Sequence, residues 1–237
     1  MTGGGRIVLT RAADAAAAWR EKLTALGFAA RLLPLLQHHP LPVPDAVRRQ
    51  RFDWILFTSP RAVRMFAAAG IDPHAARIGA VGEATRMVLN EHGLSATLVP
   101  VEQDGAGLAR VFCTRVKATA SVLLPGPSRR LPEPRRSLEL AGHCVTELPL
   151  YVTEPVPPAA LPEVPCGPED VVFFASPSAV RAWAAAWGTR PRCVAIGPTT
   201  AAACRAAGFR PRVAATPDLE AMVRAAGLVP TVPRKES

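Results

Sequence analysis

Residues 54–64 read WILFTSPRAVR, and residues 171–181 read VVFFASPSAVR. In both stretches an apolar run typical of a buried strand is followed by a Ser-Pro pair. The chain then continues with apolar residues at helical spacing. A second matching pair follows, with IGAVGEAT at residues 78–85 and CVAIGPTT at residues 193–200. These stretches predict a fold in which strands and helices alternate in two related halves.

The separation between matching residues is nearly constant. It is 117 residues between Ser59 and Ser176 and 115 residues between Gly82 and Gly197. The offset of 115 also relates Leu9 to Leu124, Gly27 to Gly142, Pro34 to Pro149 and Pro40 to Pro155. A register held this long is typical of an internal repeat, so we interpret the chain as a duplicated half.

Hydrophobic spacing predicts alternating strands and helices along the whole chain. Strands are expected at 7–10, 29–33, 54–57, 77–81, 96–99, 121–124, 144–150, 171–175, 192–196 and 211–214. Helices are expected at 14–26, 60–69, 83–92, 105–115, 131–141, 177–187, 198–207 and 218–226. Strands joined by helices of this length form parallel sheets with both faces covered. Five strands in each half is the number in a flavodoxin-like unit, so we expect two flavodoxin-like α/β domains.

Two proline-rich passages, residues 34–44 and 153–168, interrupt this alternation at equivalent points of the halves. Proline removes a backbone donor and disrupts both helices and sheet ladders. We therefore interpret both passages as extended connectors between domains, which together form a two-stranded linker.

Composition favours a small anionic ligand over nucleic acid. The net charge is +9 and the pI is about 10.3, but the 25 arginines are scattered and only 5% of residues are aromatic. Few bases could therefore stack on the surface. No apolar run approaches the roughly 20 residues that cross a bilayer, so we expect a cytoplasmic protein without membrane contact.

The cysteines and histidines do not predict a metal site. Five cysteines include no Cys-x-x-Cys pair, and we expect Cys193 and Cys204 to be small buried apolar residues. The histidines are expected at loops and helix ends with solvated side chains: His38, His39, His74, His92 and His143. No dinucleotide or phosphate-loop motif is recognised, so no cofactor is expected.

Four strand-to-helix turns carry the polar groups that could bind a ligand. Ser59 and Ser176 precede proline, a pattern typical of a helix N-cap, while Gly82 and Gly197 open helices that carry threonine. All four turns follow parallel strands, whose carboxyl ends bind ligands in open α/β sheets. Helix N-termini there could hold carboxylates or phosphates, although each Ser-Pro alone is explained by capping.

Tyr151 is the only tyrosine in the chain, and its repeat equivalent is Leu36. A phenol at a position where the other half has an aliphatic side chain suggests a polar function. An amphipathic residue on an edge strand explains it equally well.

Taken together, these residues resemble the uroporphyrinogen-III synthase family over nearly the whole chain. The resemblance rests on Thr10-Arg11, Phe57–Val63, Val81–Thr85, Tyr151, Phe174–Ser178 and Ile196–Ala201. Residues 125–130 are richer in proline than the family usually shows. The resemblance implies a lyase of tetrapyrrole biosynthesis that cyclises hydroxymethylbilane to uroporphyrinogen III, with loss of water and inversion of ring D, and without a cofactor or a metal.

The resemblance also implies roles for individual residues. Tyr151 would assist departure of the hydroxyl group, as a general acid or as a hydrogen-bond donor. The polycarboxylate substrate would be bound by residues of the four turns and of the first strand: Arg11, Thr58, Ser59, Gly82, Thr85, Ser176, Ser178, Gly197, Thr199 and Thr200.

The implied domain layout is discontinuous. Residues 1–36 and 155–237 would form one domain, residues 42–148 the inserted domain, and residues 37–41 and 149–154 the connectors. We expect a monomer that does not bind nucleic acid, and instability of the substrate suggests a transient contact with hydroxymethylbilane synthase. The alternative is a non-catalytic, flavodoxin-like binding module for a small polyanion or sugar phosphate.

Overall fold

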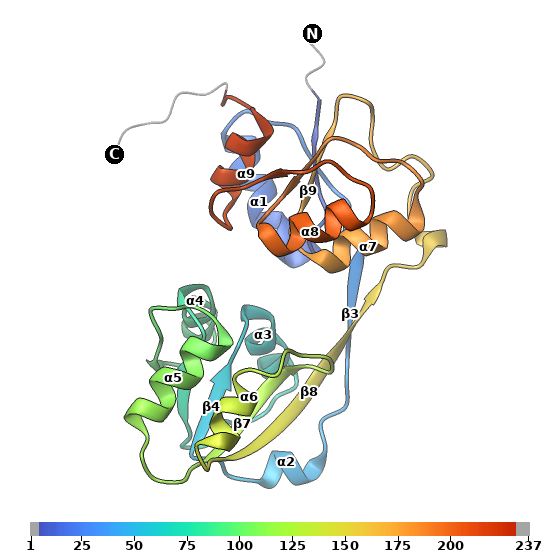
Figure 1. Ribbon diagram of the computed structural model, residues 1–237. Coiled ribbons are helices and arrows are strands. Elements are labelled where there is room, and N and C mark those ends of the chain that lie inside the picture. Colours follow the sequence, from blue (N-terminus) through green and yellow to red (C-terminus); the bar gives the residue numbers. More distant parts are fainter. Residues whose placement is uncertain (1–4, 231–237) are drawn as a thin grey trace. The chain divides into compact units, whose positions relative to one another are not determined.

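The computed structural model describes residues 5–230, without the side chains of residues 13–15. The chain divides into two compact units (Figure 1). Among the described residues, unit 1 comprises residues 5–37 and 154–230, and unit 2 comprises residues 38–153. No helix in the described part of the chain is both long and apolar enough to cross a membrane.

Unit 1 contains a parallel sheet with the strand order β11-β10-β9-β1-β2. Its strands are β1 (Ile7–Leu9), β2 (Ala30–Leu32), β9 (Val171–Phe174), β10 (Cys193–Ala195) and β11 (Arg212–Val213). Its helices are α1 (Ala13–Ala25), η1 (Pro158–Ala160), α7 (Pro177–Ala186), α8 (Pro198–Ala206) and α9 (Leu219–Ala226).

The alternation of side chains along β1 explains how both faces of this sheet are covered. Ile7 and Leu9 pack in an apolar cluster with residues of α1 and α9. Val8 points to the other face and packs in the cluster that contains residues of α7 and α8. Unit 1 is therefore a three-layer α/β unit.

Unit 2 has the strand order β3-β8-β7-β4-β5-β6. Its strands are β3 (Leu36–Pro40), β4 (Trp54–Phe57), β5 (Arg77–Ala80), β6 (Ala96–Leu98), β7 (Ser121–Pro127) and β8 (Cys144–Pro155). Its helices are α2 (Asp45–Arg49), α3 (Pro60–Ala68), α4 (Glu83–Glu91), α5 (Gly105–Arg115) and α6 (Arg135–Leu140). Strands β4 to β8 pair in parallel.

Strand β4 shows the same layering. Ile55 and Phe57 pack with residues of α3 and α4, whereas Trp54 and Leu56 pack with residues of α5 and α6. The sheet of unit 2 is therefore also covered by helices on both faces.

The predicted α/β class with parallel sheets is confirmed, but the flavodoxin-like description fits only one sheet. Numbered along the chain, the sheet of unit 1 has the order 2-1-3-4-5, which is the flavodoxin-like order. Strands β4 to β8 of unit 2 have the order 3-2-1-4-5, which is found in dinucleotide-binding folds. Each sheet still has one point at which the strand order reverses, between β1 and β9 in unit 1 and between β4 and β7 in unit 2.

The proline-rich passages contain more regular structure than predicted. Residues 36–40 form β3 at the edge of the sheet. Proline has no backbone N–H to donate, and Pro40 is tolerated here because an edge strand has a neighbour on one side only. Strand β8 continues to Pro155 instead of ending at residue 150, and α2 was not predicted. Helix α6 begins only at Arg135, four residues later than predicted.

The structure tests the burial predicted for two cysteines and for His143. Cys193 and Cys204 are buried apolar residues, as predicted. The prediction of a solvated side chain is wrong for His143, which is 6% exposed. Its Nδ1 accepts a hydrogen bond from the backbone N–H of Ala120 at 3.3 Å, and its ring packs edge-on against Phe112.

Candidate functional site

A cavity of about 400 Å³ lies at the carboxyl edge of the sheet of unit 2. It spans the point where the strand order reverses, which is where open α/β sheets bind ligands. Its walls come from the segments that follow β4, β5, β6 and β7, together with β8. They include Thr58, Ser59, Val81, Gln103, Asp104, Leu124, Arg129, Arg130, Arg135, Glu147 and Tyr151.

Ser59 places the start of α3 at this cavity. Its backbone is extended, and its Oγ accepts a hydrogen bond from the N–H of Ala62 at 3.2 Å, so it caps the helix. Pro60 then occupies the first helical position, where no N–H is needed. Thr58 and Ser59 are half-buried and both line the cavity.

The start of α4 is closed by a side chain from another loop. Gly82 is the N-cap and supplies no side-chain cap, but Gln103 Oε1 accepts a hydrogen bond from the N–H of Glu83 at 3.2 Å. A Cβ on Gly82 would clash with the side chain of Gln103 in this position, so glycine permits this close approach. Gln103 therefore separates the N-terminus of α4 from the cavity. Thr85 is buried in α4, with 2% exposure.

Tyr151 forms part of the cavity wall near the end of β8. The residue is 5% exposed, and its ring meets the ring of His38 edge-on at a centroid distance of 5.5 Å. Its backbone carbonyl accepts a hydrogen bond from the N–H of Ser128 at 2.8 Å. The Tyr151 side chain is thus largely desolvated in the cavity wall, and its backbone is held by this hydrogen bond.

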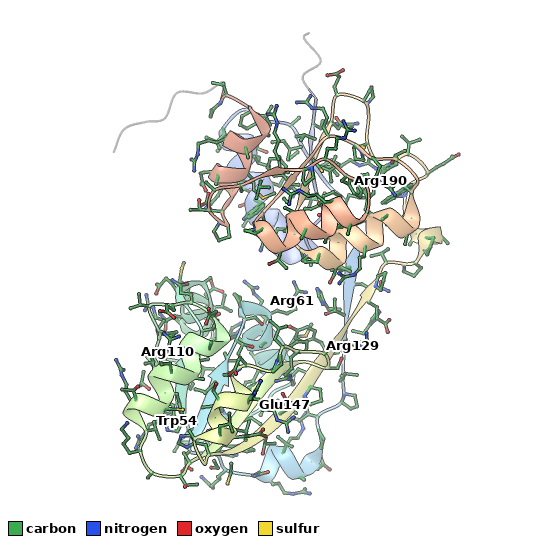
Figure 2. All side chains as sticks on the ribbon, viewed as in Figure 1. Trp54, Arg61, Arg110, Arg129, Glu147 and Arg190 are labelled. Carbon is green, nitrogen blue, oxygen red and sulfur yellow. The ribbon has the colours of Figure 1, made fainter. Side chains whose placement is uncertain are left out.

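Two adjacent arginines after β7 have different environments. Arg130 is half-buried, and its guanidinium donates hydrogen bonds to the carbonyl oxygens of Leu124, Pro127 and Leu148. Arg129 is exposed and, within residues 5–230, makes no hydrogen bond or ion pair. Figure 2 shows Arg129 on the loop after β7 and Glu147 on β8. Arg129 is therefore available to an anionic ligand.

The corresponding edge of unit 1 carries the other predicted residues. The hydroxyl of Thr10 donates to the carbonyl of Phe173 at 2.8 Å, across the point where that sheet reverses. The guanidinium of Arg11 lies 4.2 Å from the ring centroid of Trp19. Ser176 caps α7 by accepting from the N–H of Ala179 at 3.2 Å.

The remaining predicted residues of unit 1 lie at the start of α7 and α8. Ser178 Oγ accepts a hydrogen bond from Arg181 at 3.2 Å. Gly197 is the N-cap of α8, and in the described part of the chain no atom of a neighbouring segment lies within 4 Å of the position of a Cβ. Thr199 is exposed, whereas Thr200 is buried with 3% exposure.

The structure thus brings Thr58, Ser59 and Tyr151 into one cavity and places Gly82 behind Gln103. Four further residues that line this cavity were not predicted from the sequence: Gln103, Arg129, Arg130 and Glu147. A signal was present for the arginine pair, because both residues directly follow a predicted strand and so had to lie at the ligand-binding edge.

Fold and cavity together define a doubly wound α/β protein with an arginine-lined site at the carboxyl edge of one sheet. A family model described as uroporphyrinogen-III synthase HemD matches residues 17–224. The chain belongs to this family.

Individual relatives agree with this assignment. A chloroplastic uroporphyrinogen-III synthase from rice, Oryza sativa subsp. japonica, is 34% identical in an alignment 201 residues long that covers 75% of this chain and 65% of that protein. The chain therefore spans slightly less than two thirds of the rice protein. A uroporphyrinogen-III synthase from Chlorobaculum parvum is 27% identical over 86% of this chain and 90% of that protein.

A solved structure shows the same fold. The uroporphyrinogen-III synthetase from Helicobacter pylori matches with a TM-score of 0.68 and 18% identity, and covers 94% of this chain and 98% of its own.

Proposed function

We propose that the chain is a uroporphyrinogen-III synthase, a lyase that cyclises hydroxymethylbilane to uroporphyrinogen III with loss of water and inversion of ring D. The observation that carries the proposal is the family match over residues 17–224. The cavity of unit 2 supports it, because Tyr151 lies there among groups suited to a polycarboxylate. Membership of this family weighs against the alternative of a non-catalytic binding module.

Substrate binding in unit 2 would use Arg129 and the turn after β4. The guanidinium of Arg129, which has no partner among the described residues, supplies a charge-assisted donor for a carboxylate. Thr58 and the start of α3 add a hydroxyl and the positive end of a helix dipole. Thr85 contributes to the packing of α4 instead, since its side chain is buried.

In unit 1 we propose that Arg11, Ser178, Gly197 and Thr199 bind further carboxylates of the substrate. Support comes from their position at the carboxyl edge of that sheet and from the start of α8, which carries no acidic residue in its first turn. Ser176 and Thr200 would act mainly by holding the helix starts in place.

Tyr151 would act on the hydroxymethyl group. Its Oη–H bond breaks as the proton passes to the leaving hydroxyl oxygen, and the C–O bond breaks as water departs. The pyrrole nitrogen supplies the electrons that form the azafulvene, and its N–H proton returns to the phenolate. Burial of the phenol excludes competing water, and the cavity walls orient the bilane for ring closure.

We propose further that the two units are domains that arose by duplication and exchanged their first strands. The first half would supply β1, β2, β4, β5 and β6, and the second half β7, β8, β9, β10 and β11. If β7 and β8 are numbered first, unit 2 has the order 2-1-3-4-5, which is also the order of unit 1. Strands β3 and β8 would then serve as the linker.

The proposed reaction also bears on where the enzyme works and how it receives its substrate. We propose a cytoplasmic monomer that takes its unstable substrate directly from hydroxymethylbilane synthase.

The direct test is to incubate the purified protein with enzymatically generated hydroxymethylbilane and to resolve the product isomers. The type III isomer should accumulate well above the amount formed in buffer. Formation of only the uninverted type I isomer, at the rate seen in buffer, would favour the binding module.

A further inference from the structure

Arg130 owes its position to the prolines of the strand ends. Pro125, Pro127 and Pro149 provide no N–H to the ladder between β7 and β8, and the register shifts next to Pro127. Arg130 supplies donors at this point. Its Nη1 donates to Leu124 O at 2.9 Å, its Nε and Nη2 to Pro127 O at 3.1 and 2.9 Å, and its Nη2 to Leu148 O at 3.4 Å.

These hydrogen bonds occupy four of the five N–H groups of a guanidinium. Arg130 is therefore poorly suited to bind a substrate carboxylate, in contrast to Arg129. Its charge is nevertheless fixed in the wall of the cavity that contains Tyr151. The two residues are close along the ladder, because Pro127 pairs with Tyr151 in the register of β7 and β8.

The charge of Arg130 is only partly neutralised. Glu147 Oε1 lies 3.5 Å from Arg130 Nε, but the other oxygen of Glu147 also pairs with Arg135 at 3.2 Å. Burial lowers the pKa of the Arg130 guanidinium, while the Glu147 carboxylate and the Tyr151 phenol raise it. Coupling between two sites is reciprocal, so a phenol that favours the cation is itself made more acidic by that cation.

We propose that Arg130 is a positioning residue that holds a positive charge against Tyr151 and stabilises the phenolate as the proton leaves. The consequence for turnover rests on the proposed function, whereas the electrostatic coupling does not. Other charged or titratable groups face the same cavity or Tyr151 itself: His38, Asp104, Arg129, Glu133, Arg135 and Glu147.

The test uses the fact that Tyr151 is the only tyrosine in the chain. Ultraviolet absorbance of tyrosinate during an alkaline titration of the folded protein therefore reports the ionisation of one phenol. Replacement of Arg130 by glutamine should raise the pKa of Tyr151 by about one unit, the lower end of the effect of an opposite charge nearby. Arg130→Lys should restore most of the shift, and Arg129→Gln should change it much less.

Glu147→Gln provides a test of opposite sign that leaves Arg130 in place. Loss of this carboxylate should lower the pKa of Tyr151. The Glu147→Gln variant replaces Arg130→Gln in the titration if the latter does not give a native circular dichroism spectrum. The proposal is overturned if neither variant moves the titration, or if Arg129→Gln moves it as far as Arg130→Gln.

Turnover gives a second readout. Arg130→Gln should lower kcat by about 3- to 10-fold with little change in KM, because proton transfer depends on the acidity of the donor. If the titration shifts but Tyr151→Phe retains full activity, the coupling stands and the catalytic role of Tyr151 fails. If Tyr151→Phe is inactive but the titration does not shift, only the role of Arg130 fails.

Discussion

The carboxyl edges of the two sheets are built from the same turns, but only one edge has a catalytic candidate. Ser59 and Ser176 cap their helices with nearly equal backbone angles (φ −165° and −161°) and equal hydrogen bonds of 3.2 Å. Gly82 and Gly197 are N-caps with φ of −178° and −176°. These repeated residues are thus the N-caps with which the helices begin.

The two edges differ in the residues that do not repeat. In unit 2, Tyr151, Arg129 and Arg130 surround a cavity, whereas the repeat equivalent of Tyr151 is the apolar Leu36. The start of α4 is closed by Gln103, while no side chain among the described residues takes this position at the N-cap of α8. The comparison indicates that repeated residues maintain the fold, whereas the catalytic and binding roles proposed for unit 2 fall mainly on residues that do not repeat.

The largest expected effect is that of Tyr151→Phe. Loss of the phenol hydroxyl should slow the catalysed step by roughly 10²- to 10³-fold, the range for one positioned acid or donor. Stability should change little, because the ring and its packing remain. Rates with enzymatically generated bilane, together with the share of type I isomer at limiting enzyme, measure the effect. An unchanged rate and isomer ratio would make the phenol structural.

Arg129→Met should act on binding. Loss of one charge-assisted hydrogen bond is expected to raise KM about tenfold and to leave kcat within a small factor of the wild-type value. Steady-state kinetics over a range of bilane concentrations separate the two constants. A fall in kcat with an unchanged KM would contradict a role confined to binding.

The serine caps offer a matched pair. Ser59→Ala and Ser176→Ala should each destabilise the unit that contains the residue by about 1 kcal/mol, since each loses the same cap. Urea unfolding followed by circular dichroism measures both. Ser59→Ala should also raise KM, because Ser59 lines the cavity. Stability losses that differ severalfold would show that the two turns are not equivalent.

The smallest expected effect concerns acid stability. Asp170 precedes β9 and accepts N–H groups of Arg6 and Gly167, and Asp53 precedes β4 and accepts the N–H and hydroxyl of Ser121. Burial raises the pKa of Asp170, but these N–H groups and the Arg6 guanidinium lower it by more. The backbone N–H and then the hydroxyl of Ser121 lower the pKa of Asp53.

Both carboxylates therefore stabilise the folded state above the ordinary aspartate pKa of about 3.9, and this stabilisation is lost as the pH falls through their lower folded-state values. Asp170→Asn should reduce the acid dependence of the unfolding free energy more than Asp53→Asn, because Asp170 is buried and Asp53 is exposed. Urea unfolding at a series of acidic pH values compares them. An equal change in the acid dependence of the unfolding free energy in both variants would show that burial of the carboxylate does not set the size of the effect.

The sequence predicted the repeated parts of the fold well, since strand and helix periodicity and Ser-Pro caps are local signals. It failed where tertiary context decides. Residues 36–40 become a strand only because β8 lies beside them, and His143 is buried only because α5 provides Phe112. For the site, Tyr151 could be selected because it breaks the repeat. Gln103 could not, because its hydrogen bond to the start of α4 joins residues 20 positions apart.

Tyr151 is the proposed proton donor, and because it is the only tyrosine in the chain its role can be measured directly. Biosynthetic incorporation of fluorinated tyrosines of increasing acidity changes only position 151 and keeps the shape of its side chain. If the protonated phenol is the active form, the alkaline limb of the pH–kcat profile should move to lower pH by the decrease in the phenol pKa. A limb that stays in place across the series, with full activity, would contradict the assignment of Tyr151 as the acid.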